Sequence, residues 1–122
     1  LLDFTGHGCV NCRDIESRVW PDDRVRNYLN NKYVLVSLYV DDKTQLPEKD
    51  WYISNYDSKI KKTIGKQNAD FQITRFNNNA QPFYVVIDPF SEKIVYRPWG
   101  YELNIESYIS HLENGITNFY EE

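Results

Sequence analysis

The sequence has no apolar run long enough to cross a lipid bilayer, and it has no excess of positive charge. A membrane-spanning helix needs about 20 consecutive, mostly apolar residues, so the chain is not expected to insert into a membrane by itself. Its formal net charge is −4. The one basic cluster, at residues 59–62, is too short to follow a phosphate backbone. We therefore expect no nucleic-acid partner and interpret the cluster as a solvated surface.

Methionine is absent from all 122 residues. The first residues, Leu1-Leu2-Asp3-Phe4, already have the character of a buried strand, without the charged flank or cleavage site of a targeting signal. We therefore expect residues 1–122 to be a single domain cut from a longer chain, so that the missing signal says nothing about the compartment. With 41% hydrophobic and 26% charged residues, the composition is that of one ordinary soluble domain.

Cysteine is scarce: only Cys9 and Cys12 occur, with two residues between them. Neither is available for a long-range bridge, so core packing must hold the fold and the pair is free to do chemistry. The question that the sequence raises is what surrounds this pair.

The hydrophobic pattern predicts an α/β domain with elements in the order βαβ-α-ββα. Strands are expected at 1–5, 33–40, 83–88 and 94–97, the last two as an antiparallel hairpin. Helices are expected at 9–20, after 22–23, at 66–75 with Ala69, Ile73 and Phe76 inward, and at 104–115 with Gly115 as its stop. The apolar run 33–40 is typical of a central strand covered on both faces. Residues 41–65 show no clean period and are expected to be an insertion with some helix.

The cysteines fall where a helix begins after a strand. Residues at i and i+3 in a first helical turn lie on one face, with Cα atoms within the roughly 4.4–6.8 Å that a disulfide tolerates. Unpaired N–H groups and the positive end of the helix dipole stabilise a thiolate at Cys9. Cys9 is therefore expected to be the attacking sulfur, and Cys12, one turn deeper, the resolving thiol.

Two other interpretations of the pair stay open. A Cys-x-x-Cys motif can be half of a zinc site, for which the remaining ligands would be His7, the distant His111 or carboxylates. It can also be a purely structural short-loop disulfide, although so small a loop stabilises a fold little. We expect no metal, because the strand and helix around the motif match what redox chemistry requires.

Several segments resemble thioredoxin-like proteins, and more closely the C-terminal thioredoxin domain of the DsbD family of bacterial thiol:disulfide interchange proteins. Leu2-Asp3-Phe4 leads into Gly8-Cys9-Val10-Asn11-Cys12, as in the family's first strand and helix start. Residues 81–88 match the segment in which a cis-proline precedes a strand, and Gly100 matches a glycine ahead of the last helix. The resemblance covers nearly the whole chain apart from residues 41–65.

The resemblance implies a thioredoxin fold, with a central mixed β-sheet flanked by helices, and a protein-disulfide reductase that passes electrons by dithiol/disulfide exchange. It implies no cofactor. The partners would be disulfide-bearing or dithiol proteins, with a membrane electron-donor domain of the same polypeptide as a further candidate. The implied location is the periplasm or cell envelope.

The resemblance also assigns site residues. Asp3 would be the buried carboxylate that relays a proton for Cys12; the alternative is an ordinary strand-end aspartate. Pro82 would be the cis-proline facing Cys9, with the Gln81 backbone binding an extended substrate; otherwise Pro82 simply starts a strand. The family usually has an aromatic residue where this chain has Gly8, with His7 behind it, and a β-branched residue where it has Gln81.

Rival functions remain at this stage. The direction of electron flow depends on relative reduction potentials, so an oxidase or isomerase of the same fold is an alternative. A redox-silent binding module is another, with Trp51, Tyr52 and Tyr56 as a docking patch. Those aromatic residues could instead pack as a small satellite core.

Overall fold

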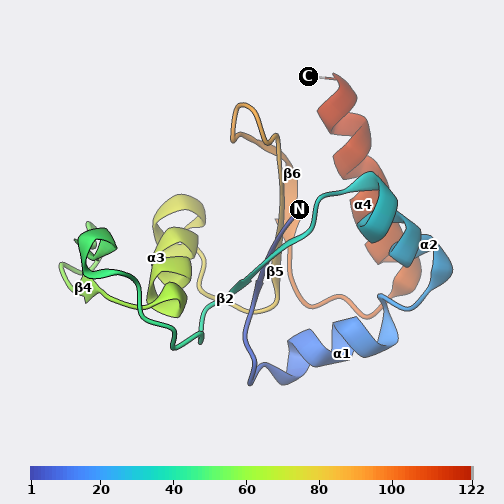
Figure 1. Cartoon of the computed structure of the whole chain (residues 1–122). Helices are drawn as coiled ribbons and strands as arrows, with labels where there is room; N and C mark the ends of the chain where they lie inside the picture. Colours follow the sequence, from blue (N-terminus) through green and yellow to red (C-terminus); the bar gives the residue numbers. More distant parts are fainter. Residues whose placement is uncertain (122) are drawn as a thin grey trace.

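The computed structural model describes residues 1–121 and shows an α/β fold built on a mixed four-stranded sheet (Figure 1). The strand order is β2-β1-β5-β6. The strands are β1 (Leu2–Thr5), β2 (Val36–Tyr39), β5 (Phe83–Ile87) and β6 (Ile94–Trp99). The main helices are α1 (Val10–Arg18), α2 (Asp23–Asn27), α3 (Ile64–Phe76) and α4 (Ile105–Glu121), and a π-helical turn, Tyr28–Lys32, follows α2.

Strand β1 lies inside the sheet, between β2 and β5. It runs parallel to β2, with Thr5 opposite Tyr39, and antiparallel to β5, with Phe4 opposite Phe83. The hairpin of β5 and β6 is antiparallel, as predicted. The mixed sheet with helices therefore agrees with the α/β class and element order expected from the sequence.

Helices pack on both faces of this sheet, so there are two cores. Side chains of β5 alternate between them, because successive residues of a strand point to opposite faces. Tyr84 and Val86 join the larger core, which α1, α2 and α4 cover. Phe83 and Val85 join the smaller one, where Phe71 and Phe76 of α3 lie with ring centroids 5.9 and 5.7 Å from Phe4. Figure 1 shows α3 on one side of the sheet and α4 on the other.

The prediction that 33–40 is a central strand was wrong. Strand β2 is shorter, Val36–Tyr39, and lies at the edge of the sheet. Val34 and Val36 are 80% and 41% exposed. A continuous apolar run is typical of a strand buried on both faces, but the run itself does not say which side of the strand has a neighbour.

The prediction that Gly115 ends the last helix was also wrong. Helix α4 is capped by Asn104, as expected, but continues to Glu121. A Cβ atom on Gly115 would lie 2.4 Å from the hydroxyl of Tyr33. That hydroxyl donates to the Leu112 carbonyl at 2.6 Å. Glycine is therefore used here for close packing inside a helix and not as a stop.

The insertion contains less helix than predicted and ends earlier. It holds a short 3₁₀ turn, Glu48–Asp50, and a two-stranded hairpin, β3 (Tyr52–Ile53) with β4 (Ile60–Lys61). Helix α3 already begins at Ile64, with Thr63 as its cap. The Asp70 carboxylate of α3 accepts hydrogen bonds from the hydroxyls of Tyr52, at 2.8 Å, and of Ser54. These hydrogen bonds link the insertion to α3.

Polar residues occupy the most buried positions of α3. Asp70 and Gln72 are buried, whereas the expected inward residues Ala69, Ile73 and Phe76 are half-buried. The predicted stripe was therefore incomplete, because Asp70 accepts hydrogen bonds from the insertion and Gln72 bonds to the segment before β5.

The three aromatic residues of the insertion that were expected to form one patch differ in their exposure. Trp51 and Tyr52 are half-buried and hydrogen-bonded, the Trp51 indole to the Leu46 carbonyl at 2.9 Å. Tyr56 is 64% exposed. Two of the three aromatic side chains are thus engaged in packing.

Candidate functional site

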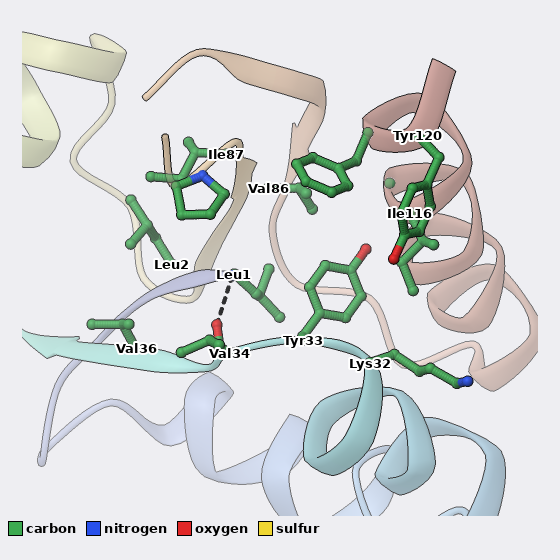
Figure 2. A pocket seen from close by; sticks show the side chains of 13 residues that line it. Leu1, Leu2, Lys32, Tyr33, Val34, Val36, Val86, Ile87, Ile116 and Tyr120 are labelled. Atoms are coloured by element: carbon green, nitrogen blue, oxygen red, sulfur yellow. Dashed lines mark hydrogen bonds between the residues drawn. The ribbon is translucent and has the colours of Figure 1, made fainter. Parts of the chain in front are cut away.

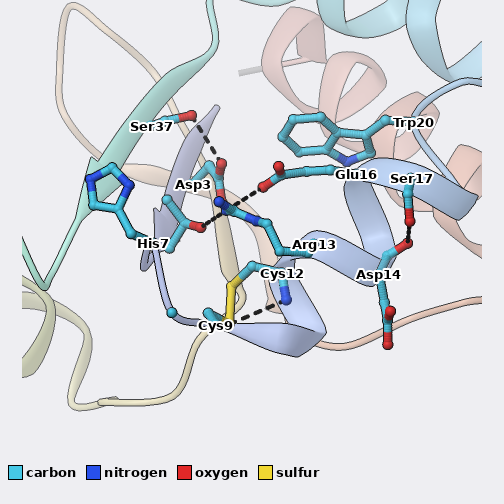
Figure 3. Close-up of polar contacts among 12 residues, drawn as sticks. Asp3, His7, Cys9, Cys12, Arg13, Asp14, Glu16, Ser17, Trp20 and Ser37 are labelled. Carbon is cyan, nitrogen blue, oxygen red and sulfur yellow. Dashed lines mark hydrogen bonds and ion pairs between the residues drawn. A yellow bond between two sulfur atoms is a disulfide. The ribbon is translucent and has the colours of Figure 1, made fainter.

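Cys9 and Cys12 form a disulfide at the start of α1 (Figure 3). Their Cα atoms are 5.3 Å apart, within the range predicted from the spacing. Cys9 is the N-cap residue of the helix, with an extended backbone, and its Sγ accepts the Cys12 N–H at 3.2 Å. Cys9 is partly exposed, whereas Cys12 is only 1% exposed. The expected difference between a more exposed Cys9 and a buried Cys12 is therefore present.

The loop that leads to Cys9 is short and closed on itself. Strand β1 ends at Thr5, and the Cys9 N–H donates to the Gly6 carbonyl at 3.2 Å. A Cβ atom added to Gly8 would meet no atom within 4 Å, and no glycine of residues 1–121 has a positive φ. The position directly before Cys9 is therefore open, and neither packing nor backbone geometry requires a glycine there.

Asp3 lies in β1 with its carboxylate buried on the inner side of α1 (Figure 3). It is 2% exposed and accepts a hydrogen bond from the Ser37 hydroxyl at 3.0 Å. Burial raises the pKa of Asp3 to about 6, with a further contribution from the negative charge of Glu16, against the opposing effects of Ser37 and Arg13. A carboxyl group with such a pKa exchanges its proton near neutral pH.

Arg13 and Glu16 complete this polar cluster, and the sequence prediction missed both. The Arg13 guanidinium donates to Glu16 at 2.7 Å and to the Thr5 hydroxyl at 3.0 Å. In Figure 3 both side chains lie beside Asp3. A signal for them was available, because Arg13 and Glu16 stand four residues after Cys9 and Cys12 and so share their helix face.

The Gln81–Pro82 peptide bond is cis. The antiparallel register that pairs Phe4 with Phe83 places Pro82 opposite Thr5 when it is continued by one residue. The segment before β5 therefore lies at the same end of the sheet as the loop that leads to Cys9. A Cβ atom on Gly100 would be 3.3 Å from the Pro82 carbonyl oxygen, so Gly100 lies against this segment.

Buried Gln72 of α3 holds the segment in place, a role that the sequence prediction missed. Its amide nitrogen donates to the carbonyl of Ala80 at 2.8 Å, and its carbonyl oxygen accepts from the Gln81 side chain at 2.9 Å. The Gln81 side chain is thus turned toward the protein. A polar residue in a helix interior gives no sequence signal for the loop that it supports.

The other candidates for a metal site lie apart. The His7 ring packs on Tyr39, with centroids 4.2 Å apart. His111 is buried in α4 and shares a 2.7 Å hydrogen bond with the Tyr96 hydroxyl. Across residues 1–121, no three His, Cys, Asp or Glu side chains are grouped so that they could hold a metal ion.

A mainly apolar cavity of about 320 Å³ is at the opposite end of the sheet (Figure 2). Its lining includes Leu1, Val36 and Ile87, at the start of β1, the start of β2 and the end of β5. The disulfide follows the end of β1. None of the candidate site residues lines this cavity.

Fold and site together define an α/β protein with a Cys-x-x-Cys disulfide at a helix start, above a buried carboxylate. No protein-family model matches the sequence, and no curated protein matches it. No helix within residues 1–121 has the length and apolar character needed to span a membrane. The function must therefore be inferred from the site itself.

Proposed function

We propose that this chain is a thioredoxin-like thiol:disulfide oxidoreductase domain that reduces disulfides of partner proteins through Cys9 and Cys12. The observation that carries the proposal is the unequal exposure of the two residues of one disulfide, with Cys9 partly exposed at the helix N-cap and Cys12 buried. A structural bridge needs no such difference. A redox pair needs one sulfur that meets the partner and one that is kept from it.

The chemistry begins with the dithiol form. The Cys9 thiolate attacks a partner disulfide, forming a mixed disulfide and releasing one partner thiolate. Cys12 then gives its proton to a base and attacks the Cys9 sulfur, which frees the second partner thiolate and restores the Cys9–Cys12 bond. Two electrons have moved to the partner, and no cofactor is involved. Another dithiol protein would then reduce the domain again.

Asp3 is our candidate for the base in the second step. It is buried on the inner side of α1, and Cys12 in the first turn of that helix is buried as well. With a pKa raised to about 6 by burial, its carboxylate is a stronger proton acceptor than an exposed aspartate at neutral pH. The charge of Glu16 raises the pKa of Asp3 further, and the charge of Arg13 lowers it.

The Gln81–Pro82 segment is our candidate for substrate contact. It lies at the same end of the sheet as the Cys9 loop, as the register of β1 and β5 indicates. An extended partner segment could hydrogen-bond the Gln81 backbone as an added strand does. In line with the resemblance, we place the domain in the periplasm or cell envelope, with a membrane domain of the same polypeptide as a candidate electron donor.

An insulin reduction assay tests the proposal. With dithiothreitol as the electron source, the domain should accelerate precipitation of the insulin B chain well above the rate with dithiothreitol alone. Cys9→Ser should abolish the acceleration. Asp14→Asn is a control on the same helix, because the Asp14 carboxylate accepts an exposed hydrogen bond from the Tyr101 hydroxyl and is none of the proposed site residues. A domain that gives no acceleration would show that the disulfide has another role.

A further inference from the structure

The Asp41 carboxylate accepts two hydrogen bonds from the loop that precedes Cys9. The His7 N–H donates to its Oδ1 at 2.9 Å, and the Gly8 N–H donates to its Oδ2 at 3.1 Å. A Cβ atom on Gly6 would lie 3.3 Å from Oδ2, so the loop approaches the carboxylate closely. One side chain thus binds two consecutive backbone groups immediately before the reactive cysteine.

The sheet explains how Asp41 reaches this loop. Strands β1 and β2 are parallel, with Thr5 opposite Tyr39, and the Val40 N–H still donates to the Thr5 carbonyl at 2.9 Å. The two chains therefore leave the sheet side by side. Asp41 follows one strand and Gly6 the other, so the contact is fixed by the register of the sheet.

Asp41 is ionised at neutral pH. The two backbone hydrogen bonds, from His7 and then Gly8, lower the pKa of its carboxyl group. The other titratable groups that act on it nearby are His7, which lowers the pKa of Asp41 further, and Asp42. A full negative charge is therefore held against the backbone N–H groups of His7 and Gly8, the two residues that precede Cys9.

We propose that Asp41 is a positioning residue for the redox pair, which fixes the Gly6–Gly8 turn and keeps the domain reducing by opposing negative charge on Cys9. This inference rests on the proposed function. A dithiol protein becomes a stronger oxidant when its reduced, thiolate form is stabilised. Asp41 acts in the opposite sense, because its charge repels the thiolate and because it occupies two N–H groups next to the sulfur.

The chain offers a matched control in the neighbouring residue. Asp42 carries the same charge one position further on, but its Oδ1 accepts the Thr44 N–H at 2.8 Å and the side chain has no hydrogen bond to the Cys9 loop. Asp41→Asn and Asp42→Asn therefore remove the same charge from adjacent positions. Only Asp41→Asn also removes the carboxylate that accepts the hydrogen bonds of His7 and Gly8 in the Cys9 loop.

The experiment is a redox titration of the domain against glutathione, combined with the rate of Cys9 alkylation by iodoacetamide at pH 6. For Asp41→Asn we expect the equilibrium to move toward the dithiol by about threefold to tenfold, which corresponds to a potential up to about 30 mV less negative. Alkylation of Cys9 should be faster by a similar factor. Asp42→Asn should change both quantities by less than about twofold.

Asp41→Ala is the second variant, since alanine removes both hydrogen bonds as well as the charge. It should also shift the equilibrium toward the dithiol. Equal effects of Asp41→Asn and Asp42→Asn, no effect of either Asp41 variant, or a shift toward the disulfide would overturn the inference. Because glutathione is the probe, these outcomes are separate from the insulin assay, whose failure in the wild-type domain would refute the proposed function instead.

Discussion

A Cys12→Ala variant is expected to remain caught in a mixed disulfide through Cys9, whereas Cys9→Ala is expected to trap little. In the first variant, the accessible sulfur at the helix N-cap can attack a partner disulfide, but the resolving attack is lost. In the second, the remaining cysteine, Cys12, is 1% exposed and its sulfur is poorly placed to meet a partner. Most of the Cys12→Ala protein should therefore become covalently linked.

The measurement is a non-reducing gel of each reduced variant after mixing with insulin, followed by mass spectrometry of the linked species. The wild-type domain is the control for release, because it should pass through the mixed disulfide without accumulating it. Trapping in cells with the same variants would then identify the physiological partner. Equal trapping by both variants, or selective trapping through Cys12, would contradict the roles assigned to the two sulfurs.

Asp3→Asn is expected to slow disulfide reduction at pH 7 to 8 by about 100-fold, the lower end of what a positioned base contributes. Asparagine keeps the shape of the side chain and an acceptor for the Ser37 hydroxyl, but it cannot take a proton from Cys12. Wild-type rates should fall as the pH drops through about 6, the pKa to which burial raises Asp3. The rates of the two proteins should therefore converge as the pH falls, to within about tenfold at pH 5. Equal pH–rate profiles from pH 5 to 8 would remove Asp3 from the mechanism.

The same substitution should make the fold more stable at pH 8, which separates a functional loss from misfolding. The pKa of Asp3 is raised by burial from its ordinary value near 3.8 to about 6. Its contribution to stability is therefore fully present below pH 3.8 and is lost as the pH rises through about 6. The lost contribution is about 3 kcal/mol. Urea unfolding of Asp3→Asn should show a gain of up to this size at pH 8 and little change at pH 4.

Ser37→Ala is the matched control for the pH argument. The Ser37 hydroxyl donates to the Asp3 carboxylate and lowers the pKa of Asp3. Its removal should therefore raise that pKa and move the fall in rate to higher pH, without abolishing the reaction. An unchanged midpoint would show that another group controls the profile.

The sequence predicted the geometry of the cysteine pair because its signals are local. Two cysteines at i and i+3, after a strand and at a helix start, determine their own geometry, and the structure has Cys9 at the N-cap and Cys12 buried. The hairpin of β5 and β6 and the Asn104 cap were likewise predictable from nearby residues. In each case the interacting residues lie within a few positions of one another.

Features that depend on distant neighbours were not predicted. The apolar run of β2 gave no sign that it lies at the sheet edge. Gly115 was taken for a helix stop because its true partner, Tyr33, lies far away in the sequence. Asp41 was assigned to the insertion, yet the parallel pairing of β1 and β2 brings it to the Cys9 loop. Single-sequence patterns do not show such pairings.

The reduction potential of the Cys9–Cys12 pair tests the account most directly. It can be measured by equilibrating the domain with glutathione buffers and following the fraction of dithiol by alkylation and mass spectrometry. A reductase of partner disulfides should have a potential more negative than about −200 mV, on the side of thioredoxin at about −270 mV. A value near about −120 mV, as in a strong protein oxidant, or a disulfide that resists reduction altogether, would contradict the proposed function.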